Sequence, residues 1–232
     1  MKYVLITGTG GGLGYELARE HVEREGYYVF ALQRHITDKL TALAEAHPQR
    51  MEVIQCDIAS TESVEKALAI VKSKTDSLDR LFNNAGIHRF KDWVTLDETE
   101  VDFITEMYNI NAVGPLRVLK AALPLLRSGS LVVHISSEAA SLTQQDAVIG
   151  YAYAMSKAGM NMGARIADNW LRERGVRSLM IHPGRMRTGM GGAHSTIDPW
   201  ETSGSLMALL DRVNEIPQDQ LFMDYKGNPM NW

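Results

Sequence analysis

The sequence predicts an α/β protein, with one doubly wound parallel sheet in a single domain. Short segments rich in β-forming residues alternate along the chain with stretches that have helical apolar spacing. The strand-like segments are mostly apolar, which is typical of parallel strands buried on both faces. The length of 232 residues suffices for one large core. The expected strands cover residues 3–7, 28–32, 52–56, 79–83, 130–135 and 177–182.

Capping residues mark where several of the expected helices begin. Thr37 and Ser60 each precede an amphipathic stretch, and Asp97 is followed three residues later by Glu100, as in a capping box. Residues 184–200 then break the alternation with closely spaced glycines and few regular apolar positions. An irregular segment of this length in a compact domain is either functional or disordered. Because it follows the last expected strand, we predict a substrate loop.

Composition excludes several classes of function. The net charge of −4 gives no electrostatic reason to expect nucleic acid or an anionic membrane as partner. No apolar run approaches the length of a membrane-spanning helix, and the short run at the start predicts a first strand rather than a signal peptide. The single cysteine, Cys56, allows no internal disulfide and suits a cytoplasmic protein.

A glycine-rich turn follows the first expected strand and opens a helix. Gly8, Gly12 and Gly14 lie within the segment TGTGGGLG. Glycines at such a place permit a tight turn and the close approach of a pyrophosphate, whose charge is favoured by the helix N-terminus. A merely flexible turn is the alternative, but the strand–turn–helix context favours a Rossmann-type dinucleotide site.

Tyr153 and Lys157 form a candidate acid–base pair. Their i, i+4 spacing at the start of an expected helix places both side chains on one face. A neighbouring ammonium and the positive end of the helix dipole favour a phenolate, so we expect a lowered pKa for Tyr153. An ordinary surface pair is the alternative. Polar residues at the ends of three other strands, in NNAG, SS and PG, favour a ligand site, because ligands bind at the carboxyl ends of parallel strands.

The ordered motifs TGTGGGLG, NNAG, the serine pair, YAYAMSK and HPGRMRT resemble those of the short-chain dehydrogenase/reductase family over nearly the whole chain. Within it the sequence is most similar to the C-factor/sniffer-like carbonyl reductases. The resemblance implies that Tyr153 exchanges a proton with the substrate oxygen and that Lys157 lowers its pKa. It implies that Ser137 binds that oxygen and that Asn111 supports a water-linked proton path. The implied cofactor-binding set is Gly8, Gly12, Leu13, Gly14, Arg34, Asp57, Asn84, Gly86, Tyr153, Lys157, Pro183 and Thr188.

The choice of cofactor depends on the end of the second strand. Gln33 stands where members of the family that prefer NAD usually carry an aspartate, and Arg34 follows it. An arginine can pair with the 2′-phosphate of NADP(H). Gly11 lacks the basic side chain that many NADP-preferring members have there. NADP(H) is therefore favoured, NAD(H) stays possible, and a solvated Arg34 is the alternative.

No metal site is expected, because the histidines lack metal-ligand spacing and the cysteine is alone. His134 and His182 fall within expected strands and are interpreted as neutral, satisfied core residues, whereas His194 in the irregular loop could touch substrate. The resemblance implies a homodimer or homotetramer and a small carbonyl or alcohol substrate. A non-catalytic dinucleotide-binding protein that signals is the main alternative function. Epimerisation or dehydration on the same fold is a weaker one.

Overall fold

The structure is a computed structural model that describes residues 1–191 and 195–232, with the side chain of Asp92 left out. Within that part of the chain, seven parallel strands form one sheet in the order β3-β2-β1-β4-β5-β6-β7. The predicted doubly wound fold is confirmed. The strands are β1 (Lys2–Thr7), β2 (Tyr27–Gln33), β3 (Met51–Gln55), β4 (Leu78–Asn83), β5 (Leu126–Ile135), β6 (Arg177–His182) and β7 (Phe222–Asp224).

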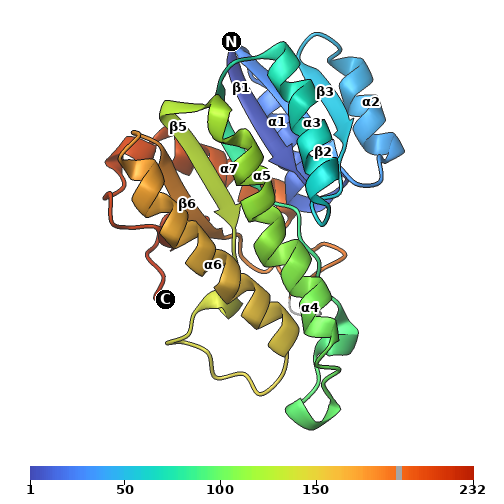
Figure 1. Cartoon of the computed structure of the whole chain (residues 1–232), viewed down its shortest axis with the longest axis vertical. Helices are drawn as coiled ribbons and strands as arrows, with labels where there is room; N and C mark the ends of the chain where they lie inside the picture. Colours follow the sequence, from blue (N-terminus) through green and yellow to red (C-terminus); the bar gives the residue numbers. More distant parts are fainter. Residues whose placement is uncertain (192–194) are drawn as a thin grey trace.

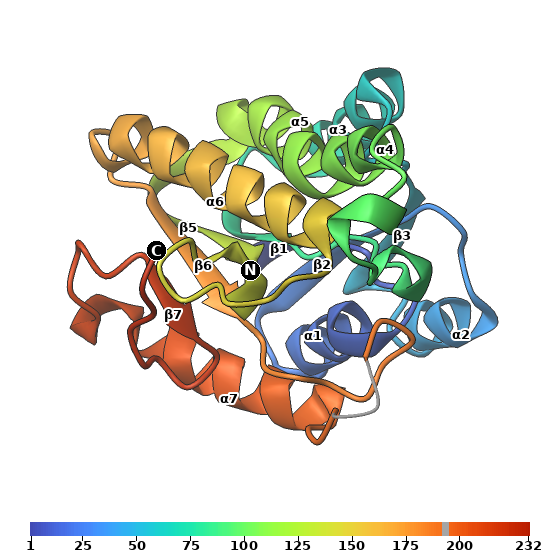
Figure 2. The same ribbon diagram turned by 90° about the horizontal axis from the view of Figure 1, so that it is seen from below.

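Helices cover both faces of the sheet and give three layers (Figure 1). In Figure 2, α3, α5 and α6 lie on one side of the strands, and α1 and α7 lie on the other. Each side has its own apolar core, because strands buried on both faces send alternate side chains to opposite layers. The α-helices are α1 (Gly12–Glu23), α2 (Asp38–Ala46), α3 (Thr61–Lys74), α4 (Phe103–Tyr108), α5 (Gly114–Ala122), α6 (Tyr151–Arg172) and α7 (Pro199–Asp211).

Two of the three predicted helix caps are confirmed. The Thr37 side chain accepts a hydrogen bond from the backbone of Leu40, and that of Ser60 accepts one from Ser63. The predicted capping box at Asp97 is wrong. Asp97 lies inside a 3₁₀ turn (Leu96–Glu98), and α4 begins only at Phe103.

The structure also differs from the prediction near the C-terminus. The three-residue strand β7 pairs with β6 at the edge of the sheet and was not predicted, because a strand this short carries no periodicity of its own. The irregular segment ends two residues earlier than expected, since Pro199 and Trp200 already belong to α7. A capping box made by Asp198 and Glu201 sets this start.

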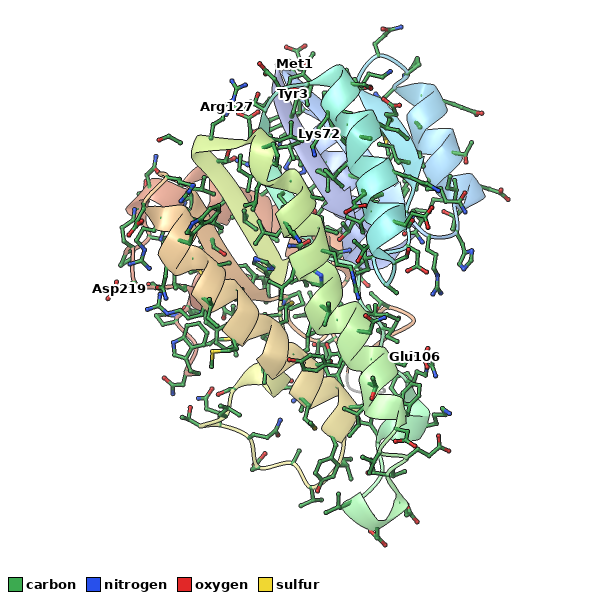
Figure 3. All side chains as sticks on the ribbon, viewed as in Figure 1. Met1, Tyr3, Lys72, Glu106, Arg127 and Asp219 are labelled. Carbon is green, nitrogen blue, oxygen red and sulfur yellow. The ribbon has the colours of Figure 1, made fainter. Side chains whose placement is uncertain are left out.

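The order of the strands positions the site. The chain runs outward from β1 to β3, then returns to the other side of β1 and continues from β4 to β7. The loops after β1 and β4 therefore diverge to opposite faces, which leaves a crevice at their carboxyl ends. In Figure 3, Tyr3 and Arg127 mark the opposite, amino-terminal edge of the sheet, and Glu106 on α4 lies toward the carboxyl-terminal edge.

Candidate active site

A cleft of about 940 Å³ opens at the carboxyl ends of the strands. Every predicted site residue except Asn111 lines it, so the structure brings together side chains from most of the chain. The lining residues from the prediction are Gly8, Gly12, Leu13, Gly14, Arg34, Asp57, Asn84, Gly86, Ser137, Tyr153, Lys157, Pro183 and Thr188.

The glycine-rich turn is built for close backbone packing. Gly8 has φ of +74°, and a Cβ placed there would lie 2.7 Å from the Cα of Ala85. A Cβ at Gly14 would collide with the carbonyl oxygen of Gly8 and with Nδ2 of Asn84. A Cβ at Gly11, by contrast, would meet nothing within 4 Å. The turn thus combines tight packing with an open face at the N-terminus of α1, an arrangement that fits a pyrophosphate.

Asn84 fastens the end of β4 to this turn. Its Nδ2 donates hydrogen bonds to the carbonyl oxygens of Thr7 (2.9 Å) and Gly8 (3.1 Å). The hydroxyl of Thr7 in turn accepts from the backbone N–H groups of Asn84 and Ala85, each at 3.0 Å. These four bonds join two strands on either side of the crevice and fix the geometry of the turn.

The end of β2 lies beside the same turn. The backbone N–H of Gly10 donates to Oε1 of Gln33 at 3.0 Å. Arg34 is exposed and lines the cleft, and its guanidinium makes no hydrogen bond or ion pair with the described residues. Asp57 lines the cleft after β3, with Oδ1 accepting from the backbone N–H of Ala59 at 2.9 Å. An exposed guanidinium beside the glycine-rich turn fits the 2′-phosphate of NADP(H).

Tyr153, Ser137 and Lys157 meet on the floor of the cleft. Tyr153 lies in the first turn of α6, and the hydroxyl of Ser137, which follows β5, is near enough to act on its phenol. The Nζ of Lys157 lies 5.8 Å from the centre of the Tyr153 ring. That Nζ donates to the carbonyl oxygen of Ile135 at 2.8 Å, so the ammonium is held inside a site that exposes only 5% of the residue.

The expectation of a lowered pKa for Tyr153 is wrong in this structure. Burial of the phenol raises its pKa above the ordinary value of 10.0; the Ser137 hydrogen bond acts in the opposite direction, and the Glu138 charge adds to the rise. Burial also lowers the pKa of Lys157 to about 8. Desolvation disfavours the charged form of both groups, which opposes the lowering expected from the Lys157 ammonium and the helix dipole. Tyr153 is therefore a neutral hydroxyl, and thus a proton donor, at neutral pH.

Asn111 lies behind the cleft rather than in its wall. It occupies a π-helical turn (Asn109–Val113), a widening that is frequent at functional sites. Its side chain accepts from the backbone N–H of Ile87 and donates to the carbonyl oxygen of the same residue, both at 2.8 Å. A Cβ on Gly86 would lie 3.1 Å from Oδ1 of Asn111 and 3.7 Å from Nζ of Lys157. Asn111 therefore holds the chain after β4 against Lys157.

The interpretation of two histidines needs correction. His182 is neutral as expected, because burial lowers its pKa, but it lines the cleft instead of the core. His134 is buried and neutral, with a pKa lowered to about 4. Asn83 donates to its Nδ1, so the ring proton resides on Nε2. That nitrogen has no partner among the described residues, so His134 is not a satisfied core residue.

Sequence reasoning missed an aromatic wall beside Tyr153. The ring of His88 packs edge-on against Tyr153 with 4.7 Å between centres, and Phe90 and Trp93 flank it at 5.1 and 5.4 Å. Trp93 Nε1 donates to Nε2 of His88. All three side chains line the cleft. In the sequence, these aromatic side chains could have been linked to the site only by their position shortly after the NNAG motif.

The predicted substrate loop borders the cleft in its described part. A Cβ at Gly12 would approach the Thr188 methyl group to 3.2 Å, so the loop reaches back to the glycine-rich turn. An isolated bridge between Met186 and Ile197 closes its base. The predicted role of His194 lies outside the described residues.

Fold and site together define a dinucleotide-binding α/β protein of the oxidoreductase type. The family model of short chain dehydrogenases matches residues 2–197, and the chain belongs to that family. C-signal from Myxococcus xanthus is 36% identical over 160 residues, which are 68% of this chain and 95% of that protein. The 1-hydroxy-2-glutathionyl-2-methyl-3-butene dehydrogenase of Rhodococcus sp. (strain AD45) is 30% identical over 236 residues, all of both chains.

The fold is shared with solved carbonyl reductases, as the resemblance implied. The NADPH-bound carbonyl reductase from chicken fatty liver is 26% identical, with a TM-score of 0.87 and coverage of 100% of this chain and 99% of that one. In the part of the chain that the structure describes, no helix is long and apolar enough to cross a membrane. No group of metal-binding side chains was found among those same residues.

Proposed function

We propose that this protein transfers hydride between NADP(H) and a small carbonyl or alcohol, with Tyr153 as general acid and base. The observation that carries the proposal is the placement of Tyr153 and Ser137 in one cleft with buried Lys157, whose Nζ lies 5.8 Å from the centre of the Tyr153 ring. A substrate oxygen near both hydroxyls would accept a proton from Tyr153 and a hydrogen bond from Ser137. The nicotinamide supplies the hydride when NADP(H) is bound.

The other residues support this chemistry without exchanging the proton with substrate. Lys157 holds a positive charge near the phenol and would bind the nicotinamide ribose. Asn111 would support a water-linked path to Lys157 by fixing the backbone at Ile87. Pro183 and Thr188 would border the nicotinamide, and residues 184–198 would form the substrate loop.

NADP(H) is the cofactor we assign to the chain. Arg34 is exposed at the cleft without an ion-pair partner among the described residues, and Gln33 brings no negative charge to the 2′-position. The NADPH complex of the similar chicken carbonyl reductase supports the same choice.

The assay is to follow NADPH absorbance with a panel of aldehydes, ketones and quinones, and NADP⁺ reduction with the matching alcohols. We expect turnover with at least one carbonyl compound. NADPH binding measured by calorimetry, without turnover of any compound, would instead support the non-catalytic signalling alternative. Turnover with NADH but not with NADPH would contradict the assignment of NADP(H) as cofactor, but it would not contradict the proposed hydride transfer with Tyr153 as acid and base.

A further inference from the structure

Two charged side chains at the cleft have no role in the proposed mechanism. Glu138 directly follows Ser137 at the end of β5, and Arg185 directly follows Gly184 after β6. Nε of Arg185 lies 2.8 Å from Oε1 of Glu138, and both residues line the cleft. The ion pair therefore joins the two loops between which a substrate would enter.

The backbone around Glu138 is held in place by further hydrogen bonds. Its N–H donates to Nδ1 of His182 at 3.1 Å, which ties the end of β5 to the end of β6. The N–H of Ala139 donates to the Ser137 hydroxyl at 3.1 Å. The carboxylate thus projects from a short 3₁₀ turn (Glu138–Ala140) whose start is fixed beside the partner of Tyr153.

Titratable and charged groups from several elements face the region of the Tyr153 phenol. Lys157 lies on α6, the helix that also carries Tyr153. His88 packs against the Tyr153 ring from the loop after β4, and Glu138 follows β5. From β6 and its loop come neutral His182 and the Arg185 cation, and Asp224 on β7 acts on His182. Of these groups, Glu138 is the carboxylate that acts on the phenol and opposes its ionisation.

We propose that Glu138 and Arg185 are positioning residues whose ion pair governs proton transfer by Tyr153. Arg185 holds the carboxylate and sets a positive charge beside it, which offsets part of the carboxylate's effect on the phenol. Without Arg185 the unpaired carboxylate would oppose the phenolate more strongly. Without the Glu138 charge the remaining guanidinium would favour it. This inference rests on the proposed role of Tyr153 as acid and base.

The test is a double-mutant cycle with opposite expected signs. Arg185→Met should raise the titration midpoint of Tyr153, and Glu138→Gln should lower it, each by about half a pH unit, the order of shift expected from one exposed charge near the phenol. The double variant should return close to wild type, because both charges are then absent. Two shifts of the same sign, or none, would overturn the inference.

The midpoint is to be measured in the NADP⁺ complex by carbon-13 NMR of Cζ-labelled tyrosine, with Tyr153→Phe identifying the signal. The same proteins give the pH profile of kcat/KM for alcohol oxidation, in which the phenolate acts as base. Both readouts should move together. If the NMR midpoint of Tyr153 shifts but the midpoint of the kcat/KM pH profile does not, Tyr153 is not the base. That result would contradict the proposed function while leaving the effect of the ion pair on Tyr153 intact.

Arg127→Met is the matched control. Arg127 forms an ion pair of similar length with Asp76, 2.9 Å, at the amino-terminal edge of the sheet, away from the cleft (Figure 3). This variant loses the same charge and should leave the Tyr153 midpoint unchanged. An equal shift in Arg127→Met would show that net charge alone moves the titration, and would overturn the inference.

Discussion

Tyr153 shows how burial decides the state of a single group. Its raised pKa keeps the hydroxyl protonated over a wider pH range, so the form that donates a proton predominates at neutral pH. The form that accepts a proton becomes common only as the pH rises. If Tyr153 is the acid and base as proposed, alcohol oxidation should accelerate toward alkaline pH, because that direction needs the phenolate.

Tyr153→Phe should reduce turnover by roughly two to four orders of magnitude, the usual contribution of general acid catalysis. Phenylalanine preserves the ring that packs against His88 and removes only the transferable proton. The measurement is kcat for any accepted carbonyl compound, with NADPH affinity and the thermal midpoint as controls. Turnover within a few-fold of wild type would exclude Tyr153 as the acid.

Arg34 should make NADPH bind more tightly than NADH, by about tenfold to a hundredfold, since an exposed arginine–phosphate pair realises only part of its strength. The missing basic side chain at Gly11 favours the lower value. Replacing Gln33 with Asp and Arg34 with Leu should reverse the preference by adding a charge that repels phosphate. Titration of both cofactors against both proteins checks this. An unchanged ratio would identify Arg34 as a solvated side chain.

At the scale of elements, the contact between β1, its turn and α1 depends on the absence of one side chain. Gly14→Ala should destabilise the protein by roughly 1–3 kcal/mol, because the new Cβ would collide with backbone at Gly8 and with the amide of Asn84. Gly11→Ala is the control, since a Cβ there meets nothing. Chemical denaturation of both variants measures the difference. Equal stabilities would mean that the turn relaxes freely.

A buried polar link joins α1, β4 and α7. His21 donates from Nδ1 to the carbonyl oxygen of Leu17 at 2.7 Å, and its Nε2 lies 3.3 Å from a guanidinium nitrogen of Arg80. Arg80 also pairs with Asp211 of α7 at 3.1 Å. Burial and the adjoining cation lower the pKa of His21 to about 3. The link therefore requires a neutral imidazole.

His21 should make stability depend on pH. Its folded pKa, about 3, lies below the unfolded value of 6.5, so its stabilising effect is complete above pH 6.5 and declines as the pH falls toward 3. The slope approaches roughly 1.4 kcal/mol per pH unit for one proton. Urea unfolding at several pH values between 7 and 5 gives the free energy of unfolding at each pH. This free energy should fall less steeply with decreasing pH in His21→Gln than in the wild-type protein. Identical slopes would contradict the assignment.

At the scale of the whole molecule, α5 and α6 expose an apolar face. It consists of Leu116, Met155, Met162, Ile166 and Trp170, each at least 40% exposed. Large apolar patches on a surface often mark protein interfaces. The family resemblance implies pairing through these helices, and a two-fold dimer, or a tetramer built from it, would bury this face.

Light scattering at micromolar concentration should give at least the dimer mass. Ile166→Glu should produce monomers, because it places a charge on this apolar face. Ile70→Glu, on the exposed side of α3, should not, since that helix lies away from α6 along the same layer. A monomeric wild-type protein would exclude the interface.

Several features could be predicted from the sequence because their causes are local. The glycine-rich turn, the caps at Thr37 and Ser60 and the i, i+4 pairing of Tyr153 with Lys157 each depend on a few neighbouring residues. Apolar alternation predicted the parallel sheet for the same reason. Asp97 shows where local rules fail, because a matching cap spacing did not by itself produce a helix.

Only the tertiary structure decided the properties that depend on burial and on distant contacts. The direction of the Tyr153 pKa follows from desolvation, which no short segment encodes. The Glu138–Arg185 pair joins residues far apart in the chain, and the weak strand β7 exists because β6 offers it an edge. The sequence by itself determined the sheet, the turn and the placement of Tyr153 and Lys157 on one face of a helix. The folded chain determined their environment, because solvent exclusion and electrostatic fields arise only when separate segments pack together.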